Sequence, residues 1–393
     1  MGEEARAKQL GIDSFTACLI DMQPLQCMTR QVPLHRNKQK TVWLAAFLLL
    51  EAACGQETRS VGLGRVIQSD PELNSILPGD AKLEQLSGGF GLLEGPVWSP
   101  GGYLLFSDMV SHVIYKWNPQ SGLSVFPVKA GFPGGGPNGL AFDKEGKLTI
   151  CEHGNRRVTR LENDGSLTVL AERYRGKRLN SPNDLVYRSD GLLYFTDPPF
   201  GLRDKNAREL PFSGVFLFSK TGLKLASDEL SGPNGLAFSP DEKYLYVGYD
   251  NQRKPVILRY EVNPNGTLAK GEMFFNAASV TKADWLDGMK VDVQGNLYVT
   301  APNGVVIISA TGKHLGTVQG PEEPTNVAWG DDDRKALYIT AEKGLYRIRL
   351  KIPGTRAFLG QLNDSDDDTG GPILTRLPTN TKDLTAPAAV LLG

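Results

Sequence analysis

The sequence predicts an all-β protein, a six-bladed β-propeller of four-stranded blades, on three observations. A motif made of a polar residue, a glycine or proline and a short apolar strand recurs six times. Each copy is followed by a second strand with a related ending, such as Tyr-Phe-Thr-Asp. The copies start 39 to 53 positions apart, a period typical of propeller blades. Because one blade cannot bury its apolar faces alone, six copies predict six blades stacked around one axis.

The polar residue that opens each copy is expected at one mouth of the central channel. The first strand of a blade leaves that mouth and the second returns to it, so the ends of the second strands should surround the six leading residues. Successive side chains alternate along a strand, and only some of these end residues can face the cavity. The six leading residues are Glu94, Asn138, Asn183, Asn234, Asp287 and Asn326.

Composition and charge restrict the classes of function. The chain has 393 residues, of which 22 % are charged and 40 % hydrophobic, as in ordinary soluble proteins. Its 44 glycines and 25 prolines fit a protein rich in tight turns. The net charge of −1 gives no excess of lysine and arginine, so we expect no nucleic-acid partner.

Residues 1–53 are predicted to be an N-terminal extension with an export signal. A basic segment, 28–40, precedes the apolar segment 42–50, which is too short to span a bilayer, and small residues then lead to Cys54. This order predicts an exported protein, periplasmic or lipid-anchored through Cys54 to a bacterial envelope membrane, with no other membrane contact. Glu51 departs from the lipoprotein pattern, so simple cleavage remains an alternative, as does a buried amphipathic helix.

Residues 54–80 are expected to be a linker, 81–350 the propeller and 351–393 a C-terminal tail. The last motif copy offers three strands, 326–329, 336–340 and 344–350, whereas a blade usually has four. We therefore predict that a strand near Leu83–Leu86 supplies the outer strand and closes the ring. Cys151 is the one cysteine of the predicted ring, so the propeller should hold together by packing rather than by a disulfide.

The leading set contains two carboxylates and four carboxamides, without a thiol or an imidazole. Such oxygen donors suit a hard cation, Ca²⁺ best, with Mg²⁺ or Mn²⁺ as substitutes. Zn²⁺ fits less well because it usually recruits nitrogen or sulfur. The alternative is structural: Pro-Asn-Gly is a common turn sequence, and Asn265-Gly266 and Asn303-Gly304 are expected to be plain turns.

Several catalytic signatures are absent from the sequence. It contains no Gly-x-Ser-x-Gly elbow, no phosphate-binding Gly-x-x-x-x-Gly-Lys-Ser/Thr loop and no His-Glu-x-x-His zinc motif. Of four histidines, His153 alone lies in phase with the predicted mouth. Hydrolysis by a histidine-activated serine is therefore disfavoured.

Four motifs carry a family resemblance. Glu94–Trp98, Ser181–Leu185 with Tyr194–Gly201, Pro233–Phe238 and Asp287–Met289 resemble the gluconolactonase/regucalcin (senescence marker protein) family. The resemblance implies a six-bladed propeller with one divalent cation in the channel. The matching ligands are Glu94, Asn183, Asn234 and Asp287, and Asp287 also matches the acid/base or nucleophile. Animal members carry an arginine where this chain has Ser181, so contacts to the sugar should differ.

The expected function is a metal-dependent lactonase that opens a small sugar lactone such as glucono-1,5-lactone. Ser181, His153, Asp197 and Asn138 are the expected substrate contacts, although His153 could be structural and Asp197 could cap the turn at 198–199. Two alternatives stay open. One is an arylesterase or phosphotriesterase that uses the same metal, and the other is a non-catalytic binding propeller stiffened by calcium.

Overall fold

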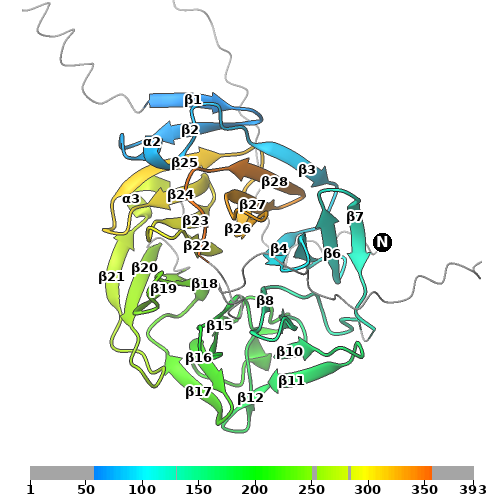
Figure 1. Ribbon diagram of the computed structural model, residues 1–393. Helices are drawn as coiled ribbons and strands as arrows, with labels where there is room; N and C mark the ends of the chain where they lie inside the picture. The colour runs from blue at the N-terminus through cyan, green and yellow to red at the C-terminus, as the bar shows by residue number, and fades with distance from the viewer. Residues whose placement is uncertain (1–56, 130, 250–254, 282–284, 356–393) are drawn as a thin grey trace, which may run out of the picture. The chain divides into compact units, whose positions relative to one another are not determined.

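The computed structural model describes residues 57–129, 131–249, 255–281 and 285–355, and these form a closed ring of six antiparallel sheets (Figure 1). This is the predicted six-bladed β-propeller. The predicted export signal, Cys54 and residues 356–393 of the predicted tail lie outside the described residues. In blades 1 to 5 the first strand in sequence is the innermost, and the chain then moves outward.

Blades 1 to 4 are regular four-stranded sheets. From the inside outward, blade 1 contains β4 (Leu93–Ser99), β5 (Tyr103–Asp108), β6 (Val113–Asn118) and β7 (Gly122–Phe126), and blade 2 contains β8 (Leu140–Phe142), β9 (Leu148–Glu152), β10 (Arg157–Leu161) and β11 (Leu167–Ala171). In the same order, blade 3 contains β14 (Leu185–Tyr187), β15 (Leu193–Asp197), β16 (Gly214–Ser219) and β17 (Gly222–Ser227). Blade 4 contains β18 (Pro233–Phe238), β19 (Tyr244–Tyr249), β20 (Val256–Glu261) and β21 (Glu272–Asn276). A two-stranded hairpin, β12 (Arg173–Tyr174) and β13 (Lys177–Arg178), lies between blades 2 and 3 in the sequence.

Blade 6 confirms the predicted closure of the ring. It contains β26 (Pro324–Gly330), β27 (Ala336–Ala341) and β28 (Gly344–Arg349), and its outer strand is β3 (Glu84–Gly88) from the start of the ring. Leu345 pairs with Ser87 and Arg347 with Glu84, so the sheet joins both ends of the propeller sequence. The outer strand begins one residue later than Leu83, the start expected from the sequence.

Residues 57–80 differ from the expected linker because they extend blade 5. That blade contains β22 (Met289–Val291), β23 (Leu297–Ala301), β24 (Gly304–Ile308) and β25 (His314–Gln319), to which β2 (Gly64–Gln68) and β1 (Glu57–Val61) are added. The added segment buries apolar side chains, among them Val66 and Ile76, which a solvated linker would not do. The first residues of the expected tail also pack here, since Thr355 N donates to Val291 O.

Helix is nearly absent from the described residues. The helical elements are α2 (Leu73–Ile76), η2 (Lys205–Ala207) and α3 (Ala278–Thr281), each a single turn. In the part of the chain that the structure describes, none of the helices has the length and apolar character needed to cross a bilayer.

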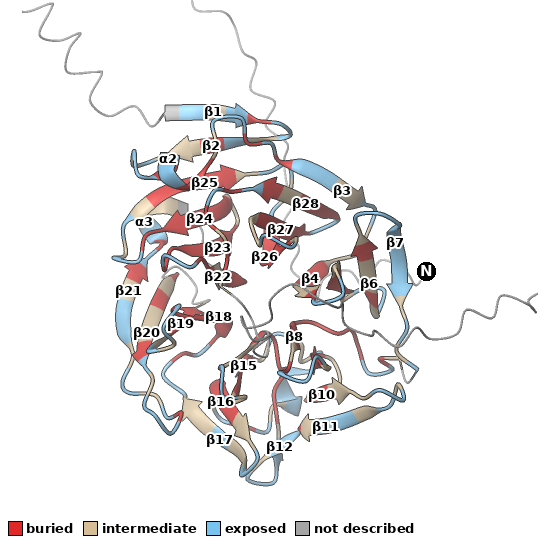
Figure 2. Cartoon of the chain, in the orientation of Figure 1, coloured by how far each residue is buried: buried red, intermediate tan, exposed pale blue. Residues whose placement is uncertain are grey.

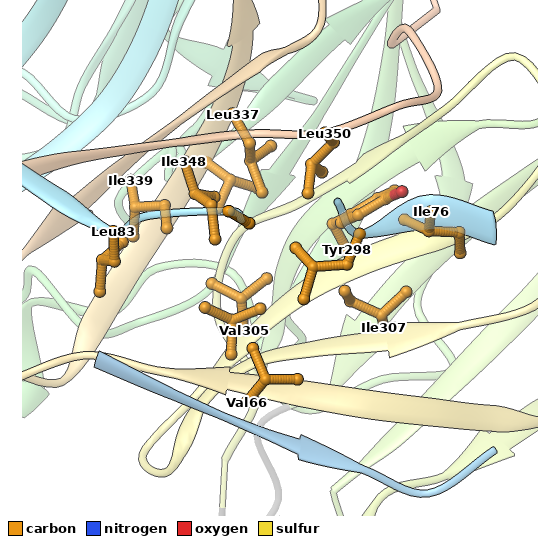
Figure 3. Close-up of a cluster of buried hydrophobic side chains, with 14 of the residues drawn as sticks. Val66, Ile76, Leu83, Tyr298, Val305, Ile307, Leu337, Ile339, Ile348 and Leu350 are labelled. Carbon is orange, nitrogen blue, oxygen red and sulfur yellow. The ribbon is translucent and has the colours of Figure 1, made fainter. Parts of the chain in front are cut away.

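Apolar cores lie between neighbouring blades, one at each of the six interfaces. The core shared by blades 5 and 6 includes Val66 and Ile76 of the added segment together with Tyr298 of blade 5 and Leu337 of blade 6 (Figure 3). The aromatic residue of the first motif packs at one of these cores, since Trp98 stacks on Tyr338 of blade 6. Burial decreases from the inner strands to the outer strands such as β7 (Figure 2). The ring is therefore stabilised by packing between blades.

Candidate active site at the channel mouth

Each inner strand begins with an irregularity at the channel mouth. In blade 3, Asn183 N donates to Thr196 O, and Thr196 N donates to Asp184 O, so two residues lie opposite one. Blades 2 and 5 repeat this pattern, and blades 1, 4 and 6 show a shift of register at the same point. Such bulges change the direction of a side chain, and they are common beside active sites. The recurring motif thus encodes a distinct geometry at each blade entry.

The glycine of the Asn-Gly pairs serves contact between blades rather than a turn. Gly139 N donates to Asn183 O of the next blade over 2.8 Å. A Cβ atom on Gly235 would lie 2.3 Å from Asp287 O. Neither glycine has a positive φ, whereas Gly266 and Gly304, from the pairs expected to be plain turns, have φ of 84° and 131°. The structure thereby separates the blade entries from ordinary Asn-Gly turns.

The predicted metal ligands all lie at blade entries around the central channel (Figure 1). Glu94, Asn183 and Asn234 are buried, and Asp287 is half-buried. Asp287 N donates to Thr300 O, which fixes the entry of β22. Four blades thus supply two carboxylates and two carboxamides at the same end of the channel.

Asn326 connects carboxylates from different blades. Its Nδ2 lies 3.1 Å from Glu94 Oε2 and 3.4 Å from Asp184 Oδ2. By strand register, however, Asn326 matches Asp184 and the motif glycines, and the residue equivalent to Asn183 is Thr325. The assignment of Asn326 to the leading set is therefore wrong by one position.

Asp184 was not singled out by the sequence reasoning, although it lies at the centre of this cluster. It is buried, and Lys290 Nζ lies 4.0 Å from its Oδ2. The signal was available in the sequence, because Asp184 stands where copies 1, 2, 4 and 5 have glycine. A carboxylate at a position otherwise reserved for glycine indicates a specific requirement for charge.

Negative charge is incompletely balanced in this part of the channel. The pKa of Glu94 is raised to about 7, mainly by burial and secondly by the charge of the Asp184 carboxylate. Hydrogen bonds from Gly95 N and Asn326 and the charge of Lys290 act in the opposite direction. A bound cation would favour the ionised form of Glu94.

The donor atoms also fit a cation of the predicted kind. Asn234 Oδ1 and Asn138 Oδ1 are buried, and neither has a hydrogen-bond partner among the described residues. A buried acceptor without a partner is costly unless something else bonds to it. The described residues contain no cluster of three or more His, Cys, Asp or Glu side chains. The leading set offers carboxylate and amide oxygens, and such donors suit a hard cation better than Zn²⁺.

His153 lies beside Asn138 at the mouth of blade 2. Its Nδ1 is 3.3 Å from Pro182 O and 3.5 Å from Asn138 Nδ2. Burial lowers the pKa of His153 to about 4, so the ring is neutral at physiological pH. Gly201 packs against the ring, since a Cβ atom there would lie 2.5 Å from Nε2. A neutral imidazole with Nδ1–H bonded to Pro182 O presents Nε2 as an acceptor.

Ser181 and Asp197 are held by backbone partners. Asp197 Oδ1 and Oδ2 accept hydrogen bonds from Ser181 N and Asn180 N, each over 2.8 Å. Ser181 Oγ donates to Pro198 O and accepts from Gly201 N. Burial raises the pKa of Asp197 to about 7 against the effect of the two N–H donors. Both side chains shape the loop that carries Asn183. The Asp197 carboxylate bonds to Asn180 and Ser181 of this loop rather than to the turn at 198–199, where the two prolines have no N–H to donate.

Known proteins match this chain over most of the ring. A family model described as "SMP-30/Gluconolactonase/LRE-like region" matches residues 92–343, from the first inner strand into the last blade. A gluconolactonase of Zymomonas mobilis is 35 % identical over 312 residues, which cover 74 % of this chain and 88 % of that protein. A pentonolactonase of Haloferax volcanii is 26 % identical over 260 residues, covering 64 % of this chain and 81 % of the other. The solved structure of a gluconolactonase from Xanthomonas campestris is 33 % identical, covers 75 % of this chain and 99 % of its own, and superposes with a TM-score of 0.66.

Proposed function

The chain belongs to the SMP-30/gluconolactonase/LRE-like family, and we propose that it is a hydrolase that opens a sugar lactone such as glucono-1,5-lactone to the sugar acid. Support for lactone hydrolysis comes from relatives with that activity in their names, which match almost the whole ring. The structural observation that carries the proposal is the buried Oδ1 of Asn234, which has no hydrogen-bond partner among the described residues and lies at the blade entry next to that of Asp287.

We further propose that the enzyme depends on one divalent cation, Ca²⁺ by preference. Glu94, Asn183, Asn234 and Asp287 would hold it. A bound cation would polarise the lactone carbonyl and stabilise the negative charge that develops on its oxygen. The cation would also balance the charge that Glu94 and Asp184 concentrate in the channel.

Asp287 is the residue that we assign to the chemical step. It is half-buried, its backbone is fixed by Thr300, and the rest of the leading set surrounds the same channel. Its carboxylate accepts the proton of the attacking water or attacks the carbonyl itself. A single turnover in heavy-oxygen water tests the two routes. General-base catalysis places the label in the product acid, whereas label found in the Asp287 carboxylate shows that Asp287 attacked the carbonyl and that water then hydrolysed the acyl intermediate at the Asp287 carboxyl carbon.

His153 and Asn138 are proposed to orient the sugar. Nε2 of the neutral imidazole accepts a hydrogen bond from a sugar hydroxyl, and the amide of Asn138 supplies a donor and an acceptor beside it. Ser181 and Asp197 act indirectly, since they hold the loop between Asn180 and Asn183 in place.

The test is a lactone-hydrolysis assay on chelated protein after separate addition of Ca²⁺, Mg²⁺, Mn²⁺ and Zn²⁺. We expect no turnover after chelation and the best recovery with Ca²⁺. Asp287→Asn should abolish turnover while metal binding persists. The control is Asp190→Asn, which removes an aspartate paired with Arg188 in the turn at the other end of blade 3. Turnover by Asp287→Asn at the wild-type rate would refute its catalytic role.

The same assay separates the rival functions. Faster hydrolysis of an aryl acetate or a fluorophosphate than of glucono-1,5-lactone would favour the esterase or phosphotriesterase alternative. Metal binding without turnover of any ester would favour a binding propeller.

The location is a separate proposal that rests on the N-terminal sequence alone. We propose export, with Cys54 as the first residue of the mature protein and the site of lipid attachment. N-terminal mapping and palmitate labelling of the wild type and Cys54→Ser test this. Labelling that persists in Cys54→Ser, or a mature protein that retains residues 28–50, would contradict it.

A further inference from the structure

A strongly basic hairpin lies at the outer edge of the ring, between blades 2 and 3 (Figure 1). The strands β12 and β13 and the turn between them carry Arg173, Arg175, Lys177 and Arg178 within six residues. The hairpin belongs to the connection from the outer strand of blade 2 to the inner strand of blade 3, which lies on the same face as Asn183. The whole chain has a net charge of −1, so the positive charge of the hairpin is a local feature of the surface.

Arg156 extends the positive charge into the interior beside this hairpin. The residue is 8 % exposed, and its Nε and Nη1 donate to Leu179 O and Ala207 O. Its Nη2 is buried and has no hydrogen-bond partner within the described part of the chain, and the same holds for Nε of Arg178. A buried N–H of a charged guanidinium that bonds to nothing is expensive. Two such donors in adjacent arginines indicate a place for an acceptor.

Glu209 is the acidic side chain closest to these arginines, and it fills that place poorly. Its Oε2 accepts from the backbone N of Arg178. Its carboxylate oxygens remain 4.0 Å from Arg156 Nη2 and 3.9 Å from Arg173 Nη1, too far for hydrogen bonds. The Glu209 side chain is 39 % exposed, so water can replace its contacts.

The remaining charged groups near Arg156 do not supply the missing hydrogen-bond acceptor. Asp197 attracts it electrostatically, but both Asp197 oxygens already bond to backbone N–H groups. The pKa of Arg156 is lowered, mainly by burial and secondly by the charge of Arg178. Three arginines thus surround one exposed carboxylate that hydrogen-bonds to none of their guanidinium groups.

The cluster adjoins the proposed active site. Arg156 N donates to His153 O in the turn between β9 and β10, so Arg156 and the proposed sugar-binding histidine share one tight turn. Leu179, the acceptor for Arg156 Nε, directly precedes the segment that leads to Asn183. The segments that carry the arginines are therefore continuous with those that carry His153 and Asn183.

We propose that Arg156, Arg173 and Arg178 form a subsite for an oxyanion carried by the lactone, a phosphate ester or a second carboxylate, which takes the place of the Glu209 carboxylate. The preferred substrates are then anionic sugar lactones. Guanidinium groups bind such oxyanions through paired, charge-assisted hydrogen bonds. The inference rests on the proposed lactonase function and adds the class of substrate.

The experiment compares three lactones on the metal-loaded full-length chain: neutral glucono-1,5-lactone, its 6-phosphate, and a glucaro-lactone with a free carboxylate. We expect kcat/KM for at least one anionic lactone to exceed that for the neutral lactone about tenfold, mainly through a lower KM. Arg173→Gln and Arg178→Gln should reduce this ratio toward one. Glu209→Gln should raise it, because the competing carboxylate is gone. The two anionic lactones show whether the subsite takes phosphate or carboxylate.

The control is Arg259→Gln, which removes an arginine of blade 4 paired with Glu272 and should keep the wild-type ratio. A ratio near one in the wild type, or a ratio that the two arginine variants leave unchanged, overturns the subsite while the lactonase function stands. If no lactone is hydrolysed, a titration with inorganic phosphate decides. Binding that Arg173→Gln abolishes and Glu209→Gln strengthens retains the anion subsite, and absence of binding overturns it.

Discussion

Asn326 Nδ2 donates to Glu94 Oε2 over 3.1 Å, and this bond joins the last blade to the first across 232 residues of sequence. The same nitrogen lies 3.4 Å from Asp184 Oδ2 of blade 3. One amide therefore contacts two carboxylates in the interior of the channel. The outer closure of the ring is a strand, and its inner closure at the mouth includes this side chain.

Asn326→Leu should destabilise the metal-free protein by about 2–3 kcal/mol, because it removes a buried hydrogen bond to a carboxylate and leaves Glu94 with fewer donors. Denaturant unfolding with and without Ca²⁺ measures the effect, which should be smaller with the cation bound. Asn263→Leu, which removes an exposed amide bonded to Thr267, is the control. Equal loss in both variants would show that Asn326 has no special role in closing the ring.

The raised pKa of Glu94 predicts a pH dependence with a defined sign. Because its pKa rises from 4.5 unfolded to about 7 in the metal-free fold, the native state binds more protons than the unfolded state between these values. The free energy of unfolding should therefore fall as the pH rises from 4.5 to about 7, by about 3 kcal/mol from this group. Glu94→Gln should lack this contribution. The difference between wild type and Glu94→Gln, measured by denaturant unfolding across this range, isolates it from Asp197 and His153.

Calcium should remove this dependence, since a bound cation selects the ionised carboxylate. A pH-independent difference between wild type and Glu94→Gln in chelated protein would mean that Glu94 is already ionised without metal.

The fold was predictable from the sequence because each blade repeats the same local arrangement in phase. The outer strand of blade 6 also followed from counting strands. The β1–β2 hairpin did not, because its partner is distant: Arg65 pairs with Gln319, and a five-residue strand has little periodicity of its own.

The site was predictable to the level of the residues that open each blade. Asp184 was not predicted because it stands where four other copies of the motif have glycine, a residue that indicates a requirement of backbone geometry rather than of charge. Arg156 and Arg178 were missed for another reason. Their contacts come from three loops whose proximity depends on how blades 2 and 3 stack, which no local pattern encodes.

Lys290→Met should strengthen Ca²⁺ binding about tenfold. Lys290 Nζ lies 4.0 Å from Asp184 Oδ2, and its positive charge also acts on Glu94. The ammonium group therefore repels a Ca²⁺ ion bound in the same channel. Without metal the variant should be less stable at neutral pH, because the two carboxylates lose their nearest cation. Calorimetric titration and thermal unfolding give the two readouts. Lys224→Met, an exposed lysine of blade 3, is the control. Weaker Ca²⁺ binding by Lys290→Met would contradict this account.

Gly201→Ala should displace His153 without touching a proposed metal ligand. The added methyl carbon would lie 2.3 Å from His153 Cδ2 and 2.9 Å from Ser181 Cβ, closer than carbon atoms approach in folded proteins, and the backbone there has no positive φ. The ring must shift to relieve this contact, and the shift displaces Nε2 from the position proposed to meet the sugar. We expect KM for the lactone to rise about tenfold while Ca²⁺ affinity stays at the wild-type value. Gly79→Ala, where the nearest atom would be 3.9 Å away, is the matched control and should leave both unchanged. If Gly201→Ala keeps the wild-type KM, His153 does not contact the substrate, and its role is confined to holding the loop at Pro182.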